Sequence, residues 1–413
     1  MSTYYVDSIA GRPENDGLTP QSAISDSSLL TNQSKGDIVL FKRGSFFRQK
    51  LETREGVTYA AYGDGEPPTF CGSTDVSSEQ DWIPTSVENI WECIKPIPGD
   101  VGNLILNRNG STEYGVFRWT QDELRDENDF WDSRYGEQVV HTPPVPQKVL
   151  FCCKDNPARV FSHIEAVSYN NRILGALRSN TVFEGLRFIN SGVHALAGNG
   201  ENIVVRNCSF ENIGGCAWSP KLRIRFGNGV ELWTLGNNVT VEGCTFKSIY
   251  DSCVTHQGPG ADTVTAINFV CRNNVFDTYG MAAFEYRDKL PINSSFTDNV
   301  CLNAGCGFAM LGEGEPRQSE IWPQPMGHHI FLWRIDAADA ESCIEIKNNF
   351  FGKAPVGAAI YSIICPQAEQ RIELDNNVYT PNDNLLIHFG GESFTSLEEY
   401  QSKTGKDKHS KYQ

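Results

Sequence analysis

The chain has 413 residues, of which 39% are hydrophobic, and this is enough apolar material for a large core. A wholly disordered chain is therefore excluded. The 35 basic and 51 acidic residues give a net charge of −16. A chain this acidic is poorly suited to coating nucleic-acid phosphates, so we expect no nucleic-acid partner.

The N-terminal sequence has neither a basic segment nor an apolar run after it, so we expect no secretory leader. No apolar stretch is long enough to span a membrane, and we expect no membrane partner. The 13 cysteines include no pair with zinc-ligand spacing. We interpret them as reduced thiols that act as small core residues, in preference to a disulfide framework or a metal or catalytic thiol. This usage predicts a cytoplasmic location.

In chain order, residues 1–75 contain short strand-like runs such as GDIVLFKRGSFFRQKL at 36–51. Residues 76–165 differ, because they are rich in tryptophan and carry unrelated short β runs. We interpret this second segment as a β-rich insertion beside the first.

Residues 166–390 are the main repeat region, and from residue 181 the chain repeats one pattern, in which an alternating strand is followed by a polar position, an aromatic or Cys, and a small-residue turn. Aligned on one position, the repeats have spacings of 22, 36, 30, 25, 50 and 28 residues; the aligned residues are Phe188, Phe210, Phe246, Phe276, Cys301, Phe351 and Tyr379. The 50-residue step is either two coils or one coil with a long loop. Alternating strands of this kind bury their inward face only by stacking as coils.

Asparagines recur at one point of this repeat. They are Asn207, Asn273, Asn274, Asn299, Asn349 and Asn377. Asn tolerates left-handed turns, and stacked Asn side chains can also satisfy one another as a ladder. After the repeat, residues 391–413 form a cap and tail, in which Ser396 and Glu399 have the spacing of a helical capping box.

These repeats, with YYVD at 4–7 and NDGLTPQSA at 15–23, resemble the right-handed parallel β-helix proteins of the pectate-lyase-like superfamily. The resemblance implies an all-β fold, a right-handed parallel β-helix with a β-rich insertion near the N-terminus and a short C-terminal capping helix. It also implies an oligosaccharide or polysaccharide partner, although this fold hosts several reactions. Such solenoids occur as monomers and as homo-oligomers, and both remain open. In such a protein Trp119 or Trp131 either packs in the core or lines a sugar subsite.

We expect the site on the outer face of one sheet, where four strands of successive coils align in register. They are GVELW at 229–233, CVTHQ at 253–257, AFEYR at 283–287 and FAMLG at 308–312. In this register Glu231, Thr255 and Glu285 form an outward column, which Trp233, Gln257 and Arg287 continue. Strict alternation directs His256 inward, and a start one residue later would bring it into the site.

Glu285 and either Asp251 or Glu231 are the candidate catalytic residues, because a glycosidase needs two carboxyl groups flanking the scissile bond. Glu231 and Glu285 lie two coils apart, about 9.6 Å between backbones, which favours inversion. This chemistry needs no metal or other cofactor.

Candidate substrate-binding residues surround these carboxylates. They are His256, Gln257, Arg287, Trp233, Lys221, Arg223, Arg225 and, on a loop at 311–328, Glu313 or Glu315. The basic loop at 221–225 suits a uronate carboxylate or a sulfate, or is a solvated surface loop.

The sequence therefore predicts a glycoside hydrolase first. The second reading is a polysaccharide lyase or epimerase acting on uronates. Its base and charge neutralisation would come from Lys221, Arg223, Arg225, His256 and Tyr286, or from Ca²⁺ held by the three carboxylates. The third reading is a non-catalytic glycan-binding solenoid.

Overall fold

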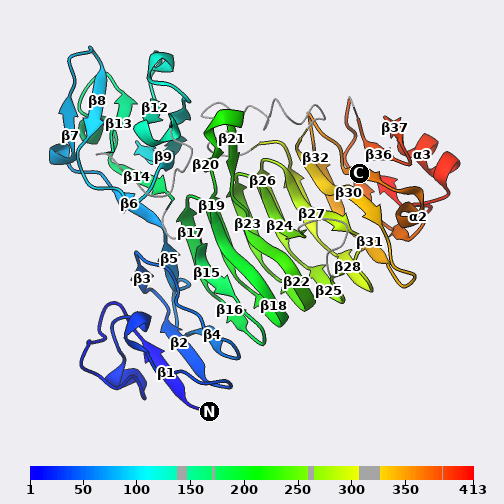
Figure 1. Ribbon diagram of the computed structural model, residues 1–413, viewed down its shortest axis with the longest axis horizontal. Coiled ribbons are helices and arrows are strands. Elements are labelled where there is room, and N and C mark those ends of the chain that lie inside the picture. The colour runs from blue at the N-terminus through cyan, green and yellow to red at the C-terminus, as the bar shows by residue number, and fades with distance from the viewer. Residues whose placement is uncertain (137–146, 170–172, 259–264, 307–325, 384) are drawn as a thin grey trace.

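The computed structural model describes residues 1–136, 147–169, 173–258, 265–306, 326–383 and 385–413. Parallel strands stack along one axis into a solenoid with three faces (Figure 1). Two of the faces belong to one 17-stranded sheet, because the long strands β18 (His194–Arg206) and β22 (Val230–Glu242) bend from one face into the next. The third face is a separate 10-stranded sheet.

The first face carries the residues discussed below. Besides the N-terminal parts of β18 and β22 it contains β15 (Ile173–Leu177), β24 (Ser252–Gln257), β27 (Ala282–Lys289), β30 (His328–Ala337), β33 (Ile360–Ile364) and β36 (Ile387–Phe389). The antiparallel strand β37 (Glu392–Phe394) follows β36 at its end.

The second face runs the full length of the solenoid. With the C-terminal parts of β18 and β22 it contains β1 (Thr3–Val6), β2 (Ile38–Lys42), β4 (Thr58–Tyr62), β16 (Val182–Glu184), β25 (Phe269–Arg272), β28 (Ser294–Thr297), β31 (Ile344–Lys347) and β34 (Ile372–Asp375).

The third face completes each coil. It contains β3 (Phe46–Phe47), β5 (Thr69–Cys71), β17 (Arg187–Ser191), β19 (Ser209–Ile213), β23 (Thr245–Ile249), β26 (Val275–Tyr279), β29 (Val300–Asn303), β32 (Phe350–Lys353), β35 (Val378–Tyr379) and β38 (Lys411–Tyr412).

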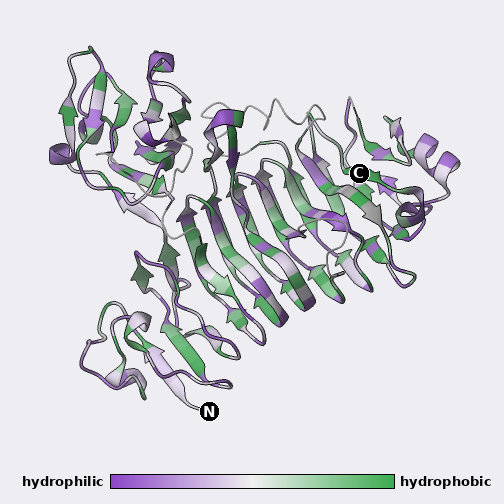
Figure 2. Cartoon of the chain, in the orientation of Figure 1, coloured by the Kyte–Doolittle hydropathy of each residue, from purple (hydrophilic) through white to green (hydrophobic). Residues whose placement is uncertain are grey.

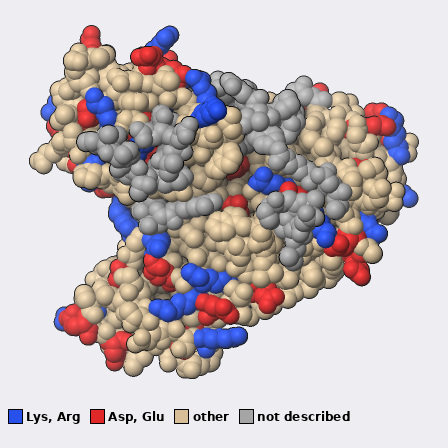
Figure 3. Space-filling view, viewed as in Figure 1, with Lys and Arg blue, Asp and Glu red and all other residues tan. Residues whose placement is uncertain are grey.

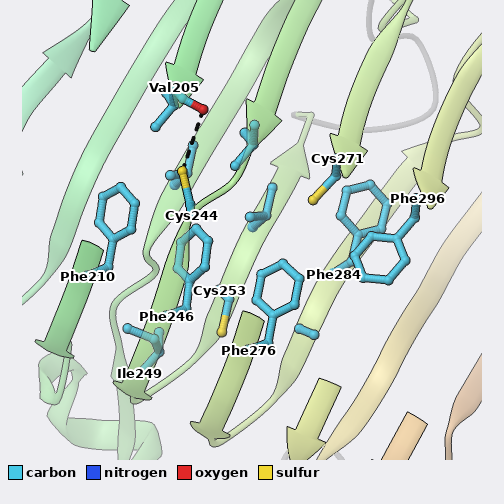
Figure 4. Packing of buried hydrophobic residues seen from close by; sticks show 14 of the residues in the cluster. Val205, Phe210, Cys244, Phe246, Ile249, Cys253, Cys271, Phe276, Phe284 and Phe296 are labelled. Atoms are coloured by element: carbon cyan, nitrogen blue, oxygen red, sulfur yellow. Dashed lines mark hydrogen bonds between the residues drawn. The ribbon is translucent and has the colours of Figure 1, made fainter. Parts of the chain in front are cut away.

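The core is a column of stacked side chains inside these three faces. The register on the third face pairs every residue of the aligned series from Phe188 to Tyr379 with its predicted neighbour. Phe210 and Phe246 stack with centroids 4.6 Å apart, and Phe246 and Phe276 with centroids 5.0 Å apart (Figure 4). Cys301 pairs directly with Phe351, so the 50-residue step is one coil and not two.

All 13 cysteines are free thiols, and ten of them are buried. Several point into the core beside the stacked rings, among them Cys244, Cys253 and Cys271 (Figure 4). The interpretation of the cysteines as small core residues is therefore confirmed for these positions.

The predicted Asn ladder exists at the corner between the second and third faces. Its buried members are Asn274, Asn299, Asn349 and Asn377. Each of the first three donates its side-chain amide to the carbonyl of the next, over 3.1–3.2 Å, and Asn377 donates to Asp407. Asn207 and Asn273 instead hold left-handed backbone angles at the same corner, with φ of 53° and 55°.

Charges on the outside of the second face are paired between coils. Arg206 binds Glu184 and Arg272 binds Glu242, each over 2.7 Å. Acidic and basic side chains lie next to one another over the lower edge of the solenoid in Figure 3. Along the strands hydrophobic and hydrophilic residues alternate, as Figure 2 shows, which is the pattern expected for strands with one buried face.

Two small sheets lie between β5 and β15 in the chain and form a lobe beside the first coils (Figure 1). One contains β6 (Ser73–Asp75), β9 (Val101–Arg108), β10 (Ser111–Tyr114) and β14 (His163–Ser168). The other contains β7 (Trp82–Pro84), β8 (Ile90–Cys93), β11 (Val116–Phe117), β12 (Asp129–Asp132) and β13 (Val149–Cys152). The lobe has its own buried core.

Helices are few and short. The α-helices are α1 (Pro157–Val160), α2 (Pro366–Glu369) and α3 (Leu397–Thr404), and the 3-10 turns are η1 (Pro20–Ser22), η2 (Ser27–Leu29), η3 (Glu79–Asp81), η4 (Gln121–Glu123), η5 (Ser133–Gly136) and η6 (Pro220–Leu222). Ser396 caps α3 by accepting from the backbone N–H of Glu399, and Leu397 and Tyr400 are buried against the last coils. None of the helices in the described part of the chain is long and apolar enough to cross a membrane.

Replacing Asn299 by alanine should lower the free energy of unfolding by about 3 kcal/mol, because buried hydrogen-bond partners in both neighbouring coils would be left unpaired. Its amide donates to the Cys271 carbonyl, and its own carbonyl accepts from the backbone of Asn274. Urea unfolding followed by circular dichroism measures the change. The control is Asn303→Ala, on an exposed side chain of the same coil, which should stay within about 0.5 kcal/mol of wild type. Equal stabilities of the two variants would contradict the ladder's role.

Candidate active site

A pocket of about 390 Å³ opens on the first face, where β22, β24, β27 and β30 pass one above another. Its lining includes Glu231, Asp251 and Glu285, the carboxylates singled out from the sequence. Trp233, Gln257 and Arg287 line the same pocket. The structure therefore brings together six of the residues predicted to form the site.

The strand register explains why these residues meet. Val230 pairs with Val254, and Val254 with Phe284, so these three side chains point into the core. Glu231 pairs with Thr255, and Thr255 with Glu285, so the outward column is the predicted one. The fourth strand of the predicted stack, 308–312, lies outside the described residues, and the described strand that pairs with β27 on this side is β30. Phe331 is therefore the next residue in the column after Glu285.

Glu231 is held by two groups on neighbouring loops and strands. His194 Nδ1 lies 2.7 Å from Glu231 Oε2, and the side-chain amide of Asn228 donates to the same oxygen over 3.1 Å. Burial alone would raise the pKa of this carboxyl. The nearby His194 and the hydrogen bonds outweigh burial and hold the pKa of Glu231 below its usual range.

Glu285 is fully buried and accepts four hydrogen bonds. Ser252, Thr255 and Gln257 donate to Oε2 over 2.8, 3.1 and 3.2 Å. The indole N–H of Trp333 donates to Oε1 over 2.8 Å, and Arg287 Nε lies 3.6 Å from the same oxygen. Both carboxyl oxygens of Glu285 are thus held in place by donors from the two strands beside β27.

Asp251 lies in the turn that leads into β24, and its residue is almost completely buried. Its backbone N–H donates to the Gly227 carbonyl and its own carbonyl accepts from Met281. The turn is thus fixed to the coil before it and to the coil after it. This fixes the third carboxyl group at the edge of the pocket, beside the column of Glu231 and Glu285.

His256 does not lie among the residues that line the pocket, so its predicted role in substrate binding has to be corrected. Its side chain follows the alternation inward, stacks on Tyr286 with centroids 5.1 Å apart, and places Nε2 2.9 Å from the Thr234 carbonyl. Burial lowers the pKa of His256 to about 4. Tyr286 is equally buried, and burial raises the pKa of its phenol far above the ordinary value.

The basic loop is also placed differently from the prediction. Arg225 is buried, where it donates to the carbonyls of Gly215 and Gly102, each over 2.6 Å, and lies over the Phe117 ring. Arg223 is 3.6 Å from Glu123, and Lys221 lies exposed in η6. None of these three side chains is among the pocket-lining residues in the described part of the chain.

The remaining predicted residues lie elsewhere or outside the description. Glu313 and Glu315 fall outside the described residues. Trp119 and Trp131 pack against Ala217, and neither is among the residues that line the pocket. Among the described residues no three His, Cys, Asp or Glu side chains are grouped closely enough to hold a metal ion.

Sequence reasoning missed the other residues that line the pocket, among them His194, Trp218, Asn228 and Trp333. His194 and Trp333 lie on β18 and β30, the strands on either side of the three that were aligned correctly. Placing the fourth strand at 328–333 would have found Trp333. Asn228 lies only three residues before Glu231 in the sequence, and this short spacing was the signal that could have pointed to it.

Residues 164–320 match the family model described as the right-handed beta helix region. The fold is a right-handed parallel β-helix. XylC, solved in complex with xylose, is 13% identical with a TM-score of 0.51, over 93% of this chain and 63% of XylC. This chain thus spans less than two thirds of XylC's length.

A family 28 exopolygalacturonase from Yersinia enterocolitica is 13% identical with a TM-score of 0.41, over 100% of this chain and 78% of that one. A GH136 lacto-N-biosidase from Eubacterium ramulus is 15% identical with a TM-score of 0.31, over 100% and 67%. A search of curated proteins finds no match. At these identities the structural likeness establishes the fold alone.

The buried, neutral His256 should make the protein less stable in mild acid. Its folded pKa of about 4 lies below the ordinary 6.5, so between these values the unfolded chain binds a proton that the folded chain does not. Stability should therefore fall as the pH falls through this window. His256→Gln should remove about 2 kcal/mol of the loss between pH 7 and pH 5.

Urea unfolding at the two pH values measures this difference. If His256→Gln and wild type lose the same stability on acidification, the inward placement of His256 as a neutral ring is refuted.

Proposed function

We propose that this protein is a glycoside hydrolase that cleaves an oligosaccharide or polysaccharide in the pocket of the first face. The observation that carries the proposal is the meeting of Glu231, Asp251 and Glu285 in one pocket whose walls include three tryptophans. Carboxyl groups supply the acid and the base of glycoside hydrolysis, and aromatic faces bind the apolar faces of sugar rings. The broader class, a carbohydrate-active enzyme, is further supported by the fold shared with XylC.

The three carboxyl groups lie in different surroundings, and these differences assign their roles in hydrolysis. His194 and Asn228 hold the pKa of Glu231 below its usual range, whereas Glu285 is fixed in place by four hydrogen-bond donors. Either of them supplies the negative charge that activates water or attacks the sugar. Asp251 is then the group that protonates the leaving oxygen, because hydrolysis needs one acid and one base on opposite sides of the bond.

A lyase or epimerase acting on uronates is less well supported. It needs a base and a positive charge facing the uronate carboxylate. Three of the residues predicted for those tasks, Arg225, His256 and Tyr286, are buried in other contacts. The three carboxylates of the pocket would also repel a uronate, and Arg287 is the one arginine among its lining residues in the described chain.

We further propose that the protein works in a reducing compartment such as the cytoplasm. The support is the set of 13 free cysteines, since free thiols persist where glutathione and thioredoxin keep them reduced.

Glu285→Gln should lower kcat by a factor of about 10²–10⁴, because the change removes a charge that stabilises the reacting sugar. The assay uses neutral and acidic oligosaccharides and follows both new reducing ends and the ultraviolet absorbance of unsaturated uronates. The control is Glu345→Gln, in β31 on the second face, which is not among the residues that line the pocket. New reducing ends without the absorbance support hydrolysis. The absorbance would establish a lyase, and full activity of Glu285→Gln would contradict the assignment.

Asp251→Asn should lose much less activity on aryl glycosides with a good leaving group than on oligosaccharides, because a nitrophenolate departs without a proton. The ratio of kcat/KM for the two substrate types, against wild type, measures the effect. Glu231→Gly and Glu285→Gly should be slow on both types. Added azide should restore aryl-glycoside cleavage to the variant that has lost the carboxylate which attacks the sugar or activates water, because azide can take the place of that anion. An equal loss for Asp251→Asn on both substrates would refute its role as the acid.

A further inference from the structure

The hairpin of β20 (Cys216–Ser219) and β21 (Ile224–Phe226) presents Trp218 at the pocket rim. Trp218 is 56% exposed, although tryptophan is usually well covered in folded proteins. Its ring stacks on no other described ring. Ile224 and Phe226 from the second strand of the hairpin line the same wall of the pocket.

The backbone beneath this exposed ring is firmly fixed. Ala217, the neighbour of Trp218, is completely buried, and its N–H donates to the Asp100 carboxylate of the lobe over 3.1 Å. The aromatic residues of the lobe pack on its other side. Arg225, opposite Ala217 in the hairpin, ties the hairpin to Gly215 and Gly102.

A large apolar ring held on a rigid support in the lining of a pocket with three carboxyl groups offers apolar area whose burial under a ligand is favourable. Pyranose rings have an apolar face of C–H groups that fits a tryptophan ring. The carboxylates in the same pocket disfavour an acidic sugar at this position.

We infer that Trp218 is the platform on which a neutral pyranose ring of the substrate stacks. The inference rests on the proposed function, since it assigns the sugar-binding part of the same pocket. The lobe, an insertion in the solenoid sequence, thereby acts in substrate binding by fixing the hairpin.

The test compares wild type with Trp218→Ala and Trp218→Phe, using two-to-four-unit oligomers of xylose, glucose, galactose and galacturonic acid. Binding is read by calorimetry and by tryptophan fluorescence, and turnover by reducing ends. We expect Trp218→Ala to weaken binding of a neutral oligomer, and to raise its KM, about tenfold with kcat changed less. Trp218→Phe should recover most of this loss. Phe46→Ala, at another exposed aromatic outside the pocket, should behave as wild type.

Each outcome separates this inference from the proposed function. Binding that depends on Trp218 without any turnover supports the platform and refutes the hydrolase. Turnover with an unchanged KM in Trp218→Ala refutes the platform and leaves the hydrolase in place. Preferred binding of the galacturonate oligomer, or no binding of any oligomer to wild type, overturns the inference.

Discussion

The hydrogen bonding of each strand to the same strand one coil away is the constraint on which the rest of this structure depends. It makes neighbours of residues that lie 22 to 50 positions apart in the chain, and it keeps every side chain on the face that the alternation gives it. A slip of one residue in β24 would turn Thr255 into the core and His256 into the pocket. The buried valines and phenylalanines of the first face resist such a slip, because it would carry Val254 and Phe284 into water. The position of the carboxylate column is therefore set by the packing of the core behind it.

The same constraint makes it feasible to bury charge on the outer face. A carboxylate that leaves water pays for its desolvation unless donors replace the water. Glu285 obtains its donors from its own column and from the two strands beside it, since Ser252, Thr255 and Gln257 come from β24 and Trp333 from β30. Because these donors are carried by paired strands, they are already oriented before any substrate arrives. Groups preorganised in this way stabilise charge in a reacting sugar without further rearrangement.

Much of this arrangement could be predicted from the sequence, and the exceptions have physical causes. The aligned phenylalanines gave the correct register because core positions must hold apolar side chains at every coil. After Glu285 the alternation alone did not single out β30, the strand that pairs with β27, because the run at 308–312 is apolar as well. Arg225 was misjudged because a sequence shows the charge of a side chain but not the carbonyls that will surround it. Trp218 escaped notice for a similar reason, since its exposure depends on a hairpin held by residues more than a hundred positions earlier.

The dependence of Trp218 on the hairpin and the lobe shows how a stack of similar coils acquires a particular site. The stacking itself gives a long, uniform face, and an outward column of side chains can be changed without disturbing the core. The stacking cannot supply a wall that rises above the first face, because the strands of this face all lie in one sheet. Here the wall comes from the β20–β21 hairpin, and the hairpin has its position because the lobe places Asp100, Gly102 and Phe117 against it. The coils thus determine the positions of the carboxyl groups, whereas the lobe determines the position of the hairpin that lines the pocket beside them. A change of substrate could therefore arise from changes in the lobe and hairpin while the carboxylates and their donors stay as they are.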